Sequence, residues 1–584
     1  MGGIHRSNQA RNRRQRQTVD GRQSTVYSRQ STRDLRLPSR DPRPATHDPR
    51  PATQFHVRIR RANSGARGDI PGVTTAFPDS GSLPSALTAD VCVRALAARD
   101  ARFDGLFFVG ITSTRIYCRP VCPARVSHTD RRRFFGSAAA AERAGFRPCL
   151  RCRPELAPGR APVDAVSRLG YTAARRIEAG ALNGHTVTEL AAEFGVSARH
   201  LRRALEREYG VAPGELAQTY RLLMAKRLLA DTTLPVTRIA FASGFQSLRR
   251  FNAAFREQYR MAPSALRRAP RSKRAPSSLR NGDTAPDSAE QVLRLTLAYR
   301  VPFDWQGLLT MLRRGALPAV ELVDETRYIR TVQLDGHAGI IHVTDGRGHL
   351  VVDLSSSLVP ALMPLLPRLR RIFDLDAEPL VIDDHLARAG LGPLVHRRPG
   401  VRLPGTFDPF DVLLSALAAD GVEPDHSVPV MRRLVEALGR PLETGIPGLG
   451  RLAPDAASVA DAGAAELERL GMSRGAATML AVVAGEMAAS RLRLDPGCDA
   501  AAAESALQRL GVSRQVAVSV ILRALHWPDA FPETDPELLT RADQWRPWRA
   551  YGAVHLWLTR DERHQPRGPS RRQASRRNPE HSRL

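Results

Sequence analysis

Hydrophobic and polar positions follow a helical period over residues 163–268, and the pattern occurs there twice. The first copy begins at Val187 with a short apolar helix, turns at Gly195 and continues in a second helix capped by Ser197. The second copy turns at Gly244. Apolar residues three and four positions apart form one face of a helix, so each copy predicts two packed helices joined by a turn. In the first copy the expected core is Leu190, Ala191, Phe194, Val196, Leu201 and Leu205.

The second helix of each copy has an outward face that is polar and mostly basic. In a helix-turn-helix protein this helix enters the major groove, where its side chains contact base edges. The segment Tyr220–Leu229 predicts one continuous amphipathic helix between the copies. Either copy alone is compatible with ordinary packed helices, but two copies joined by a helix favour a DNA-binding domain. The residues expected to face DNA are Arg199, His200, Arg202, Arg203, Gln246, Ser247, Arg249 and Arg250.

The carboxyl-terminal half changes from a strand pattern to a helical one. Leu293–Ala298 and Arg327–Val352 alternate apolar and polar residues, as strands with one buried face do. After Leu358 the chain is rich in Ala and Leu and follows a helical pattern. We therefore expect an α+β subdomain followed by an all-α subdomain. The Met and Leu residues of 361–376 are expected to build a core rather than to bind a cofactor.

Three segments lack the apolar positions that a core requires. Residues 1–85 are rich in Arg, Ser, Pro and Thr, and are expected to be a disordered basic arm or to precede the true translation start. Residues 269–291 have the basic, Ser- and Pro-rich composition of a linker. Residues 561–584 are expected to be a solvated basic tail with some nonspecific affinity for DNA.

The whole chain of 584 residues carries a formal charge of +28, which indicates a polyanionic partner. Double-stranded DNA is the expected partner, because neutralisation of phosphates dominates such binding. Hydrophobic residues make up 42% of the chain, which is enough for several cores. No apolar run approaches the ~20 residues of a membrane span, and the first residues are polar and Arg-rich, unlike a secretory signal. We expect a cytoplasmic protein with reduced cysteines.

Four of the six cysteines lie in one stretch as two close pairs. Cys118 and Cys122 form the first pair, and Cys149 and Cys152 form the second. Two such pairs can converge on one tetrahedral Zn²⁺ through four thiolates, with four buried thiols or a disulfide framework as the alternatives. Paired cysteines in an intracellular protein favour the metal. The two other cysteines are expected to be small packing residues.

Arginines and aromatic residues surround the cysteine pairs. Four thiolates leave a Zn²⁺ site anionic, and arginine side chains offset that charge. The planar guanidinium also matches phosphate oxygens, and a metal-bound thiolate remains nucleophilic if a substrate reaches it. A nucleophile held in a phosphate-binding surface indicates alkyl transfer from a phosphate ester. These surrounding residues are Arg115, Arg119, Arg125, Arg147, Arg151, Arg153, Tyr117, Phe134, Phe135 and Phe146.

The stretch from about Asp90 to Pro154 resembles the amino-terminal domain of the Ada family of alkylation-repair proteins. The family motifs F-C-R-P-x-C-x-A-R and A-G-F-R-P-C-x-R-C match Tyr117–Arg125 and Ala144–Cys152, with Tyr in place of the first Phe. The resemblance implies that all four paired cysteines bind zinc. It also implies that Cys118 irreversibly accepts a methyl group from a methylphosphotriester in DNA.

The paired helix-turn-helix units resemble the AraC family of DNA-binding domains. The similarity includes the Gly-Phe at Gly244, Phe251-Asn-Ala-Ala-Phe-Arg and Tyr259-Arg-Met-Ala-Pro-Ser. It covers both units and implies transcriptional activation, for which RNA polymerase is an expected partner.

Residues from about Leu293 to Leu558 resemble the AlkA type of DNA-3-methyladenine glycosylase. The similar stretches include Val301-Pro-Phe-Asp-Trp, Pro399-Gly-Val-Arg-Leu-Pro-Gly and Trp545-Arg-Pro-Trp-Arg. A monofunctional glycosylase flips the damaged nucleotide out of the duplex and needs a carboxylate beside the sugar to stabilise the developing oxocarbenium ion. The resemblance implies that Asp535 is this carboxylate, and a helix-capping role is the alternative.

Two sequence features limit the chemistry that is expected of the glycosylase-like half. The family's P-G-I-G hairpin occurs here as Gly511-Val512-Ser513 without the second glycine, which predicts weaker anchoring of a DNA phosphate. The chain has only two lysines, Lys226 and Lys273, and neither lies in this half. A lysine Schiff base is therefore excluded there, and base excision is expected to leave an abasic site uncut.

Together these observations predict a multidomain α+β protein that combines DNA alkylation repair with transcriptional activation, with Zn²⁺ as its cofactor. The alternative is a methylation-responsive regulator whose glycosylase-like half is inactive and only binds DNA. The expected order is a basic arm (1–85), an Ada-like zinc methyl-acceptor domain (86–160), an AraC-type double helix-turn-helix domain (163–268), a linker (269–291), an AlkA-like α+β subdomain (292–400), a helix-hairpin-helix glycosylase subdomain (401–560) and a basic tail (561–584).

Overall fold

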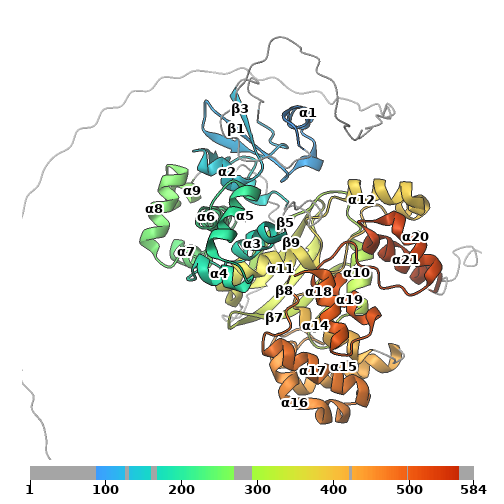
Figure 1. Ribbon diagram of the computed structural model, residues 1–584. Coiled ribbons are helices and arrows are strands. Elements are labelled where there is room, and N and C mark those ends of the chain that lie inside the picture. The colour runs from blue at the N-terminus through green and yellow to red at the C-terminus, as the bar shows by residue number, and fades with distance from the viewer. Residues whose placement is uncertain are drawn as a thin grey trace, which may run out of the picture. The chain divides into compact units, whose positions relative to one another are not determined.

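The computed structural model describes residues 87–124, 131–158, 168–268, 292–419, 424–495 and 498–564. All of them belong to one compact unit of the chain, Ala76–Leu584. The expected basic arm, the linker and most of the basic tail lie outside the described residues. Figure 1 shows a small sheet domain in blue, a helical segment in green, and an α+β and then helical half that runs from yellow-green to red. No helix in the described part of the chain is long and apolar enough to cross a membrane.

The amino-terminal domain is a four-stranded sheet with two helices. Its strand order is β3-β1-β2-β4, in which only β2 and β4 run parallel. Val109 pairs with Cys118, so the sheet fixes the position of the first cysteine of the motif. The elements are α1 (Ala89–Ala98), β1 (Phe108–Ile111), β2 (Ile116–Cys118), β3 (Arg132–Phe135), α2 (Ala138–Arg143) and β4 (Arg147–Pro148).

The core of this domain is aromatic. Phe108 and Tyr117 pack edge to face, with ring centroids 5.7 Å apart, and Phe135 lies against Phe146 at 5.4 Å. These rings leave no space at Gly110, where an added Cβ would lie 2.8 Å from atoms of Phe135 and Phe146. Glycine is therefore required in the middle of β1 for the sheet to pack against its own aromatic residues.

The green segment consists of two helix-turn-helix units on either side of one long helix. Thr186, Ser197 and Ser247 cap α4, α5 and α8, and each hydroxyl accepts a hydrogen bond from a backbone N–H of the first turn. Gly195 and Gly244 lie in the two turns with positive φ of 65° and 81°, as the sequence predicted. The helices are α3 (Arg168–Glu178), α4 (Val187–Glu193), α5 (Ala198–Tyr209), α6 (Pro213–Asp231), α7 (Val236–Ala242), α8 (Leu248–Tyr259) and α9 (Pro263–Arg268).

Helix α6 is longer than the connecting helix that the sequence predicted, and it contributes to two cores. Its first half adds Leu216 to the core of Leu190, Leu201 and Leu205. Its second half adds Leu222 and other residues to the core of the second unit. The predicted core of the first unit is confirmed except that Phe194 and Val196 are only partly buried.

The carboxyl-terminal half begins with an antiparallel sheet of order β5-β9-β8-β7-β6. The predicted alternation is visible in β5, where Leu293, Leu295 and Leu297 are buried between more exposed residues. Helix α10 and strand β6 were not predicted from the sequence. The elements are β5 (Val292–Ala298), α10 (Trp305–Arg314), β6 (Glu321–Val323), β7 (Arg327–Leu334), β8 (His337–Asp345), β9 (His349–Ser355) and α11 (Leu362–Ile372).

The rest of this half is helical and packs around one large apolar core. Two of its helix pairs are hairpins of the same design: Gly471 and Gly511 have positive φ, and Ser473 and Ser513 cap the next helix. The helices are α12 (Pro379–Leu386), α13 (Gly392–Arg397), α14 (Pro409–Ala418), α15 (Pro424–Leu438), α16 (Ala456–Arg469), α17 (Arg474–Ala488), α18 (Ala500–Arg509), α19 (Arg514–Ala524), α20 (Pro536–Ala542) and α21 (Arg549–His564).

Candidate functional site

The two cysteine pairs converge in the amino-terminal domain. Cys118 ends strand β2, Cys122 lies in the turn after it, and Cys149 and Cys152 follow β4. The four Sγ atoms all lie within 4.8 Å of one another. A tetrahedron of thiolates around Zn²⁺, with Zn–S bonds of about 2.3 Å, has edges of roughly 3.8 Å, so this spacing fits the ion.

The four cysteines differ in access. Cys122, Cys149 and Cys152 are buried, whereas Cys118 is only half-buried. The predicted pairing therefore forms one site, and Cys118 is the most exposed of its four residues. A thiolate must be reachable to act as a nucleophile, so this difference distinguishes Cys118 from the other three.

The close approach of the four sulfurs favours a bound cation. Hydrogen bonding, mainly with Cys122, raises the pKa of the Cys118 thiol. Hydrogen bonding, mainly with Cys118, lowers the pKa of the Cys149 thiol. Neighbouring sulfurs cannot all ionise without a counter-charge, since each thiolate opposes the next. A set of four sulfurs without a carboxylate or an imidazole suits Zn²⁺, which removes this repulsion and keeps all four ionised.

Backbone amides and one ion pair support the sulfurs. Arg119 N–H donates to Cys152 Sγ at 3.4 Å, and Arg151 N–H donates to Cys149 Sγ at 3.4 Å. The Arg119 side chain donates to Asp104 Oδ1 at 2.8 Å and to the Cys152 carbonyl at 3.2 Å. Groups of this kind orient metal ligands and moderate the charge on the sulfurs.

The predicted arginine collar is only partly available to a phosphate. The guanidinium of Arg119 is committed to Asp104, and that of Arg153 is committed to Glu155 and Asp231. Arg115 lies over the Phe146 ring at 5.6 Å. Arg147 is half-buried and Arg151 is exposed, while Arg125 lies outside the described residues.

The aromatic residues that the sequence places among the cysteines mostly belong to the core of the domain and do not surround the sulfurs. Tyr117, Phe135 and Phe146 are buried in the domain core, and Phe134 is half-buried against Phe107. Sequence spacing placed them beside the ligands, but side chains alternate along a strand. Tyr117 and the adjacent Cys118 therefore face opposite sides of the sheet, as do Phe134 and Phe135.

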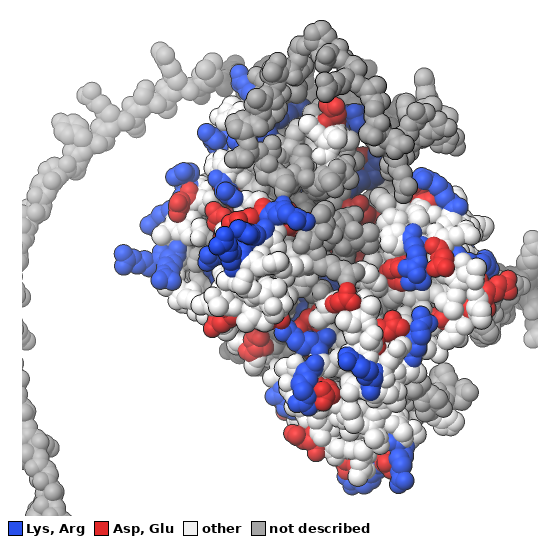
Figure 2. Space-filling view, viewed as in Figure 1, with Lys and Arg blue, Asp and Glu red and all other residues white. Residues whose placement is uncertain are grey.

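The predicted DNA-facing residues lie on α5 and at the start of α8, where Gln246 and Ser247 directly precede the first residue of the helix. Seven of the eight are exposed, namely Arg199, His200, Arg202, Arg203, Gln246, Arg249 and Arg250. The eighth, Ser247, is half-buried because its hydroxyl caps α8 and accepts from Arg250 N at 3.2 Å. Figure 2 shows basic side chains gathered over this helical segment on the face turned to the viewer.

Asp535 has a simple environment. It is exposed, it caps α20, and its Oδ1 accepts from Glu537 N at 3.0 Å. Within the described residues, no hydrogen bond to Oδ2 is recorded. The capping role that the sequence left as an alternative is therefore present, and it leaves the second carboxylate oxygen available.

A neighbouring carboxylate has more contacts than Asp535. Glu533 Oε1 accepts from Trp557 Nε1 at 2.8 Å and from Arg560 Nη1 at 3.2 Å. This links the chain just before Asp535 to α21 and holds a half-buried indole. Sequence reasoning did not assign a role to either residue, because nothing in the spacing of positions 533 and 557 indicates that they meet.

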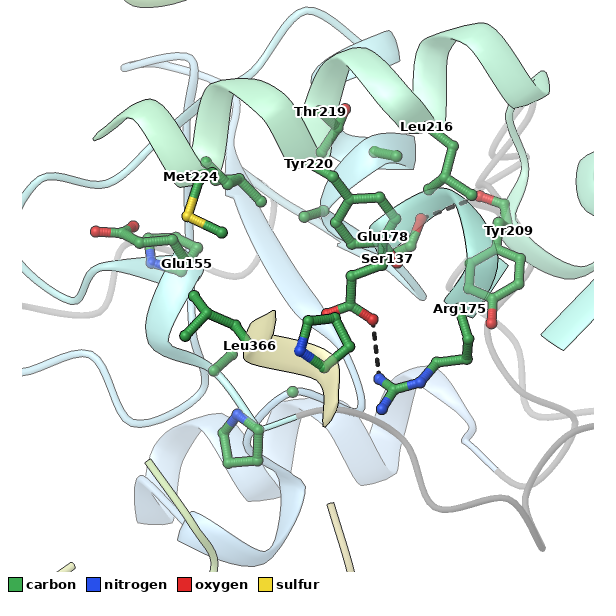
Figure 3. Close-up of a pocket in the computed structure, with 18 of the residues that line it drawn as sticks. Ser137, Glu155, Arg175, Glu178, Tyr209, Leu216, Thr219, Tyr220, Met224 and Leu366 are labelled. Atoms are coloured by element: carbon green, nitrogen blue, oxygen red, sulfur yellow. Dashed lines mark hydrogen bonds and ion pairs between the residues drawn. The ribbon is translucent and has the colours of Figure 1, made fainter. Parts of the chain in front are cut away.

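A cavity of about 200 Å³ lies beside helix α6. Figure 3 shows Thr219, Tyr220 and Met224 of α6 along one side, with Ser137 and the Arg175–Glu178 ion pair also lining the cavity. None of the four paired cysteines lines it, and neither does Asp535. The cavity is therefore separate from both candidate reaction centres.

Three family models match the chain in the predicted order. They are described as the metal binding domain of Ada over residues 91–155, a helix-turn-helix domain over 190–269 and the AlkA N-terminal domain over 294–408. A relative from Mycobacterium tuberculosis, named a probable bifunctional transcriptional activator/DNA repair enzyme AlkA, is 34% identical over 80% of this chain and 96% of its own length. The chain belongs to this family. Its four clustered cysteines are the Zn²⁺ site of the Ada-type domain.

Two further matches are partial. DNA-3-methyladenine glycosylase 2 of Escherichia coli is 28% identical and covers 45% of this chain and 96% of its own length. The structure of a 3-methyladenine DNA-glycosylase from Archaeoglobus fulgidus covers 46% of this chain and 98% of its own, with 17% identity and a TM-score of 0.40. The family assignment rests on the sequence relatives and the domain models.

Proposed function

We propose that this member of the family is a DNA alkylation-repair protein and a transcriptional activator in one chain. The observation that carries the proposal is the cluster of four cysteines, of which Cys118 is the one residue that is only half-buried. The double helix-turn-helix segment supplies sequence-specific DNA binding, and the AlkA-like half supplies base excision. DNA is the common partner of all three modules, and the reduced thiols of the zinc site fit a cytoplasmic location.

Cys118 accepts the methyl group. Its Sγ attacks the methyl carbon of a phosphotriester, an S–C bond forms, and the C–O bond breaks with its electron pair on the phosphate oxygen. The products are a phosphodiester anion and an S-methyl thioether, so the protein is consumed in the reaction. Zn²⁺ supplies a thiolate that stays ionised at neutral pH. The Arg119 and Arg151 amides hold the neighbouring sulfurs in place.

Methylation also changes the charge of the site. A thioether ligand has one negative charge fewer than a thiolate, which lessens repulsion between the domain and DNA phosphates. We expect the methylated protein to bind its promoter more tightly through α5 and α8 and to recruit RNA polymerase there. The exposed arginines of both recognition helices support the DNA contact.

Asp535 stabilises the oxocarbenium-like transition state of base excision. Its exposed carboxylate at the start of α20 has Oδ2 available, and Oδ1 is fixed by the backbone of Glu537. Alkylated bases such as 3-methyladenine are the proposed substrates, and hydrolysis leaves an abasic site. The enzyme names of the relatives favour this proposal over a half that only binds DNA.

The switch is tested by titration with a methylphosphotriester duplex. Specific DNA affinity should rise as one methyl group is taken up per chain, and Cys118→Ala should show no rise. A Cys118→Ala protein that still bound DNA more tightly after the same treatment would refute the role of this sulfur.

A further inference from the structure

The amino-terminal domain touches the long helix α6 at three polar points, and each point leads to a zinc ligand or to the residue beside one. The first begins at Tyr117, which precedes Cys118. Its hydroxyl donates to Glu142 Oε1 at 2.9 Å, and Thr219 Oγ1 of α6 donates to Glu142 Oε2 at 2.6 Å. The residue beside the methyl acceptor is thus joined to α6 through a single carboxylate.

The second point is a buried lysine of α6. Lys226 Nζ donates to the backbone carbonyl of Cys149 at 2.9 Å and forms an ion pair with Glu155. The side chains of Lys226 and Glu155 are each only 2% exposed. A buried ion pair often adds little net stability, but it fixes the groups it joins in one arrangement, because an unpaired buried charge is costly.

The third point closes the second cysteine pair onto the end of α6. Arg153, which follows Cys152, makes a two-pronged contact with Asp231, at 2.6 Å to Oδ1 and 2.8 Å to Oδ2. Such fork-to-carboxylate pairs are directional as well as strong. Thr219 and Lys226 are two turns apart on α6, so these contacts run along the helix rather than meeting at one end.

The same domain also touches both recognition helices. Ser137 Oγ donates to the carbonyl of Tyr209, the last residue of α5, at 3.0 Å. Gln258 of α8 donates through Nε2 to the carbonyl of Phe146 at 3.3 Å. Because α6 is part of both helix-turn-helix cores, a change in how it is held alters how α5 and α8 are presented to DNA.

We propose that α6 is a mechanical link that reports the state of the zinc centre to both recognition helices, through Thr219, Lys226 and Asp231. This inference rests on the proposed methyl-acceptor function and names the route of its regulation. A change of ligand at Cys118 moves Tyr117 and the cysteine loops, and the three contacts transmit that movement to α6. The charge change alone requires none of these contacts, so the two routes are separable.

The test breaks the Lys226 contact without unpairing a buried charge, because Arg153, the other partner of Glu155, keeps Asp231. In Lys226→Met with Glu155→Gln both charges are lost together, and the volume of each side chain is kept. Thr219→Val is a second variant, which removes one donor with little change in shape. Gln218→Ala is the matched control, because Gln218 is an exposed residue of the same helix, with no side-chain hydrogen bond or ion pair among the described residues. All are made in the full-length protein, and zinc content is measured first.

Two measurements are made before and after methylation by a methylphosphotriester duplex. Wild-type protein and Gln218→Ala should gain DNA affinity by about 5- to 150-fold, the usual range for coupled sites. The double variant should still take up one methyl group, but its gain should fall to about twofold or less, with an intermediate value for Thr219→Val. Amide hydrogen exchange in α6 should change on methylation in the wild type and not in the double variant.

The outcomes separate this inference from the function on which it rests. A double variant that keeps the full gain, or a wild type whose exchange changes only within residues 87–158, overturns the link and leaves the methyl-acceptor function standing. If the wild type takes up no methyl group, the proposed function fails. In that case Cys118→Met, which supplies a thioether without transfer, provides the same exchange comparison and decides whether the link exists.

Discussion

The two proposed reaction centres of this protein differ in how completely the chain itself assembles them. At the zinc centre four sulfurs converge, three of them are buried, and backbone amides donate to two of them. At Asp535 one exposed carboxylate caps a helix, and one backbone amide is its recorded partner. The first site is complete before DNA arrives, whereas the second needs the flipped nucleotide to enclose it.

This difference follows from the chemistry of each reaction. A metal-bound thiolate must be held ionised in the resting protein, so its ligands and their amide donors have to be in place beforehand. A glycosylase instead obtains much of its selectivity from the extruded base, which is read only when it enters the pocket. Substitution of a zinc ligand should therefore destabilise the folded domain. Substitution of Asp535 should lower catalysis and leave the fold intact.

The largest effect is expected at a buried zinc ligand. Cys149→Ala removes one of four thiolates, and structural Zn²⁺ contributes about 10 kcal/mol or more to the folding of small metal domains. We expect loss of stoichiometric zinc and of hydrogen-exchange protection over residues 87–158. Cys498→Ala is the control, since Cys498 is a half-buried thiol far along the sequence from the cluster. Full zinc content in Cys149→Ala would show that this cysteine is not a ligand.

The next effect is on catalysis alone. Asp535→Asn should lower the release of 3-methyladenine from alkylated DNA by roughly 10²- to 10³-fold, because the amide no longer stabilises the developing positive charge. Asn caps helices about as well as Asp, so the free energy of unfolding should change by only a few tenths of a kcal/mol. Asp543→Asn, at a neighbouring 65% exposed carboxylate, is the control. Equal base release by wild type and Asp535→Asn would leave Asp535 without its role.

A smaller effect is expected from the carboxylate two residues earlier. Glu533→Ala releases Trp557 Nε1 and Arg560, so the indole and the start of α20 lose a common anchor. We expect base release to fall about fivefold, which corresponds to about 1 kcal/mol for one partly exposed hydrogen bond. Glu533→Gln keeps an acceptor for the indole and should restore most of the rate. If both variants match the wild type, the anchor does not contribute to excision.

The smallest effect concerns pH and the domain that holds the zinc centre. Burial raises the pKa of Glu142 to about 7, although hydrogen bonds from Thr219 and Tyr117 oppose the shift. Since the unfolded pKa is about 4.3, this group contributes stability that is present below pH ~4 and is lost as pH rises through ~7. Glu142→Gln should remove that decline. We expect it to gain about 1 kcal/mol relative to wild type between pH 4.5 and 7.5, measured by denaturant unfolding, because residual exposure weakens the effect. A parallel pH profile for the two proteins would contradict the assigned shift.

The comparison also explains what the sequence could predict. The cysteine pairs, the two glycine turns and the serine caps are local patterns whose physics acts over a few residues, so the metal cluster and both helix-turn-helix units were predicted correctly. Strands with alternating burial, such as β5, were predicted for the same reason. Strand β6 was missed because three residues give little periodic signal. Helix α10 was missed although Leu308, Leu309 and Leu312 have helical spacing.

The remaining features depend on contacts between distant positions. Nothing in the sequence indicates that Lys226 meets the carbonyl of Cys149, or that Glu533 meets Trp557. The arginine collar was overestimated for the same reason, since its members Arg119 and Arg153 pair with Asp104 and Asp231, which are distant from them in the chain. Which arginine pairs with which carboxylate depends on how the folded chain packs, so it cannot be predicted from the pattern of residue types along the sequence.

The most direct test of methyl acceptance is to find where the methyl group goes. Reduced, zinc-loaded protein is incubated with a duplex that carries isotopically labelled methylphosphotriesters, digested, and analysed by mass spectrometry. We predict one label per chain, located on the sulfur of Cys118, with none on Cys122, Cys149 or Cys152. Label on another residue, or no label on a protein that holds one Zn²⁺ per chain, would contradict the role of Cys118 as the methyl acceptor.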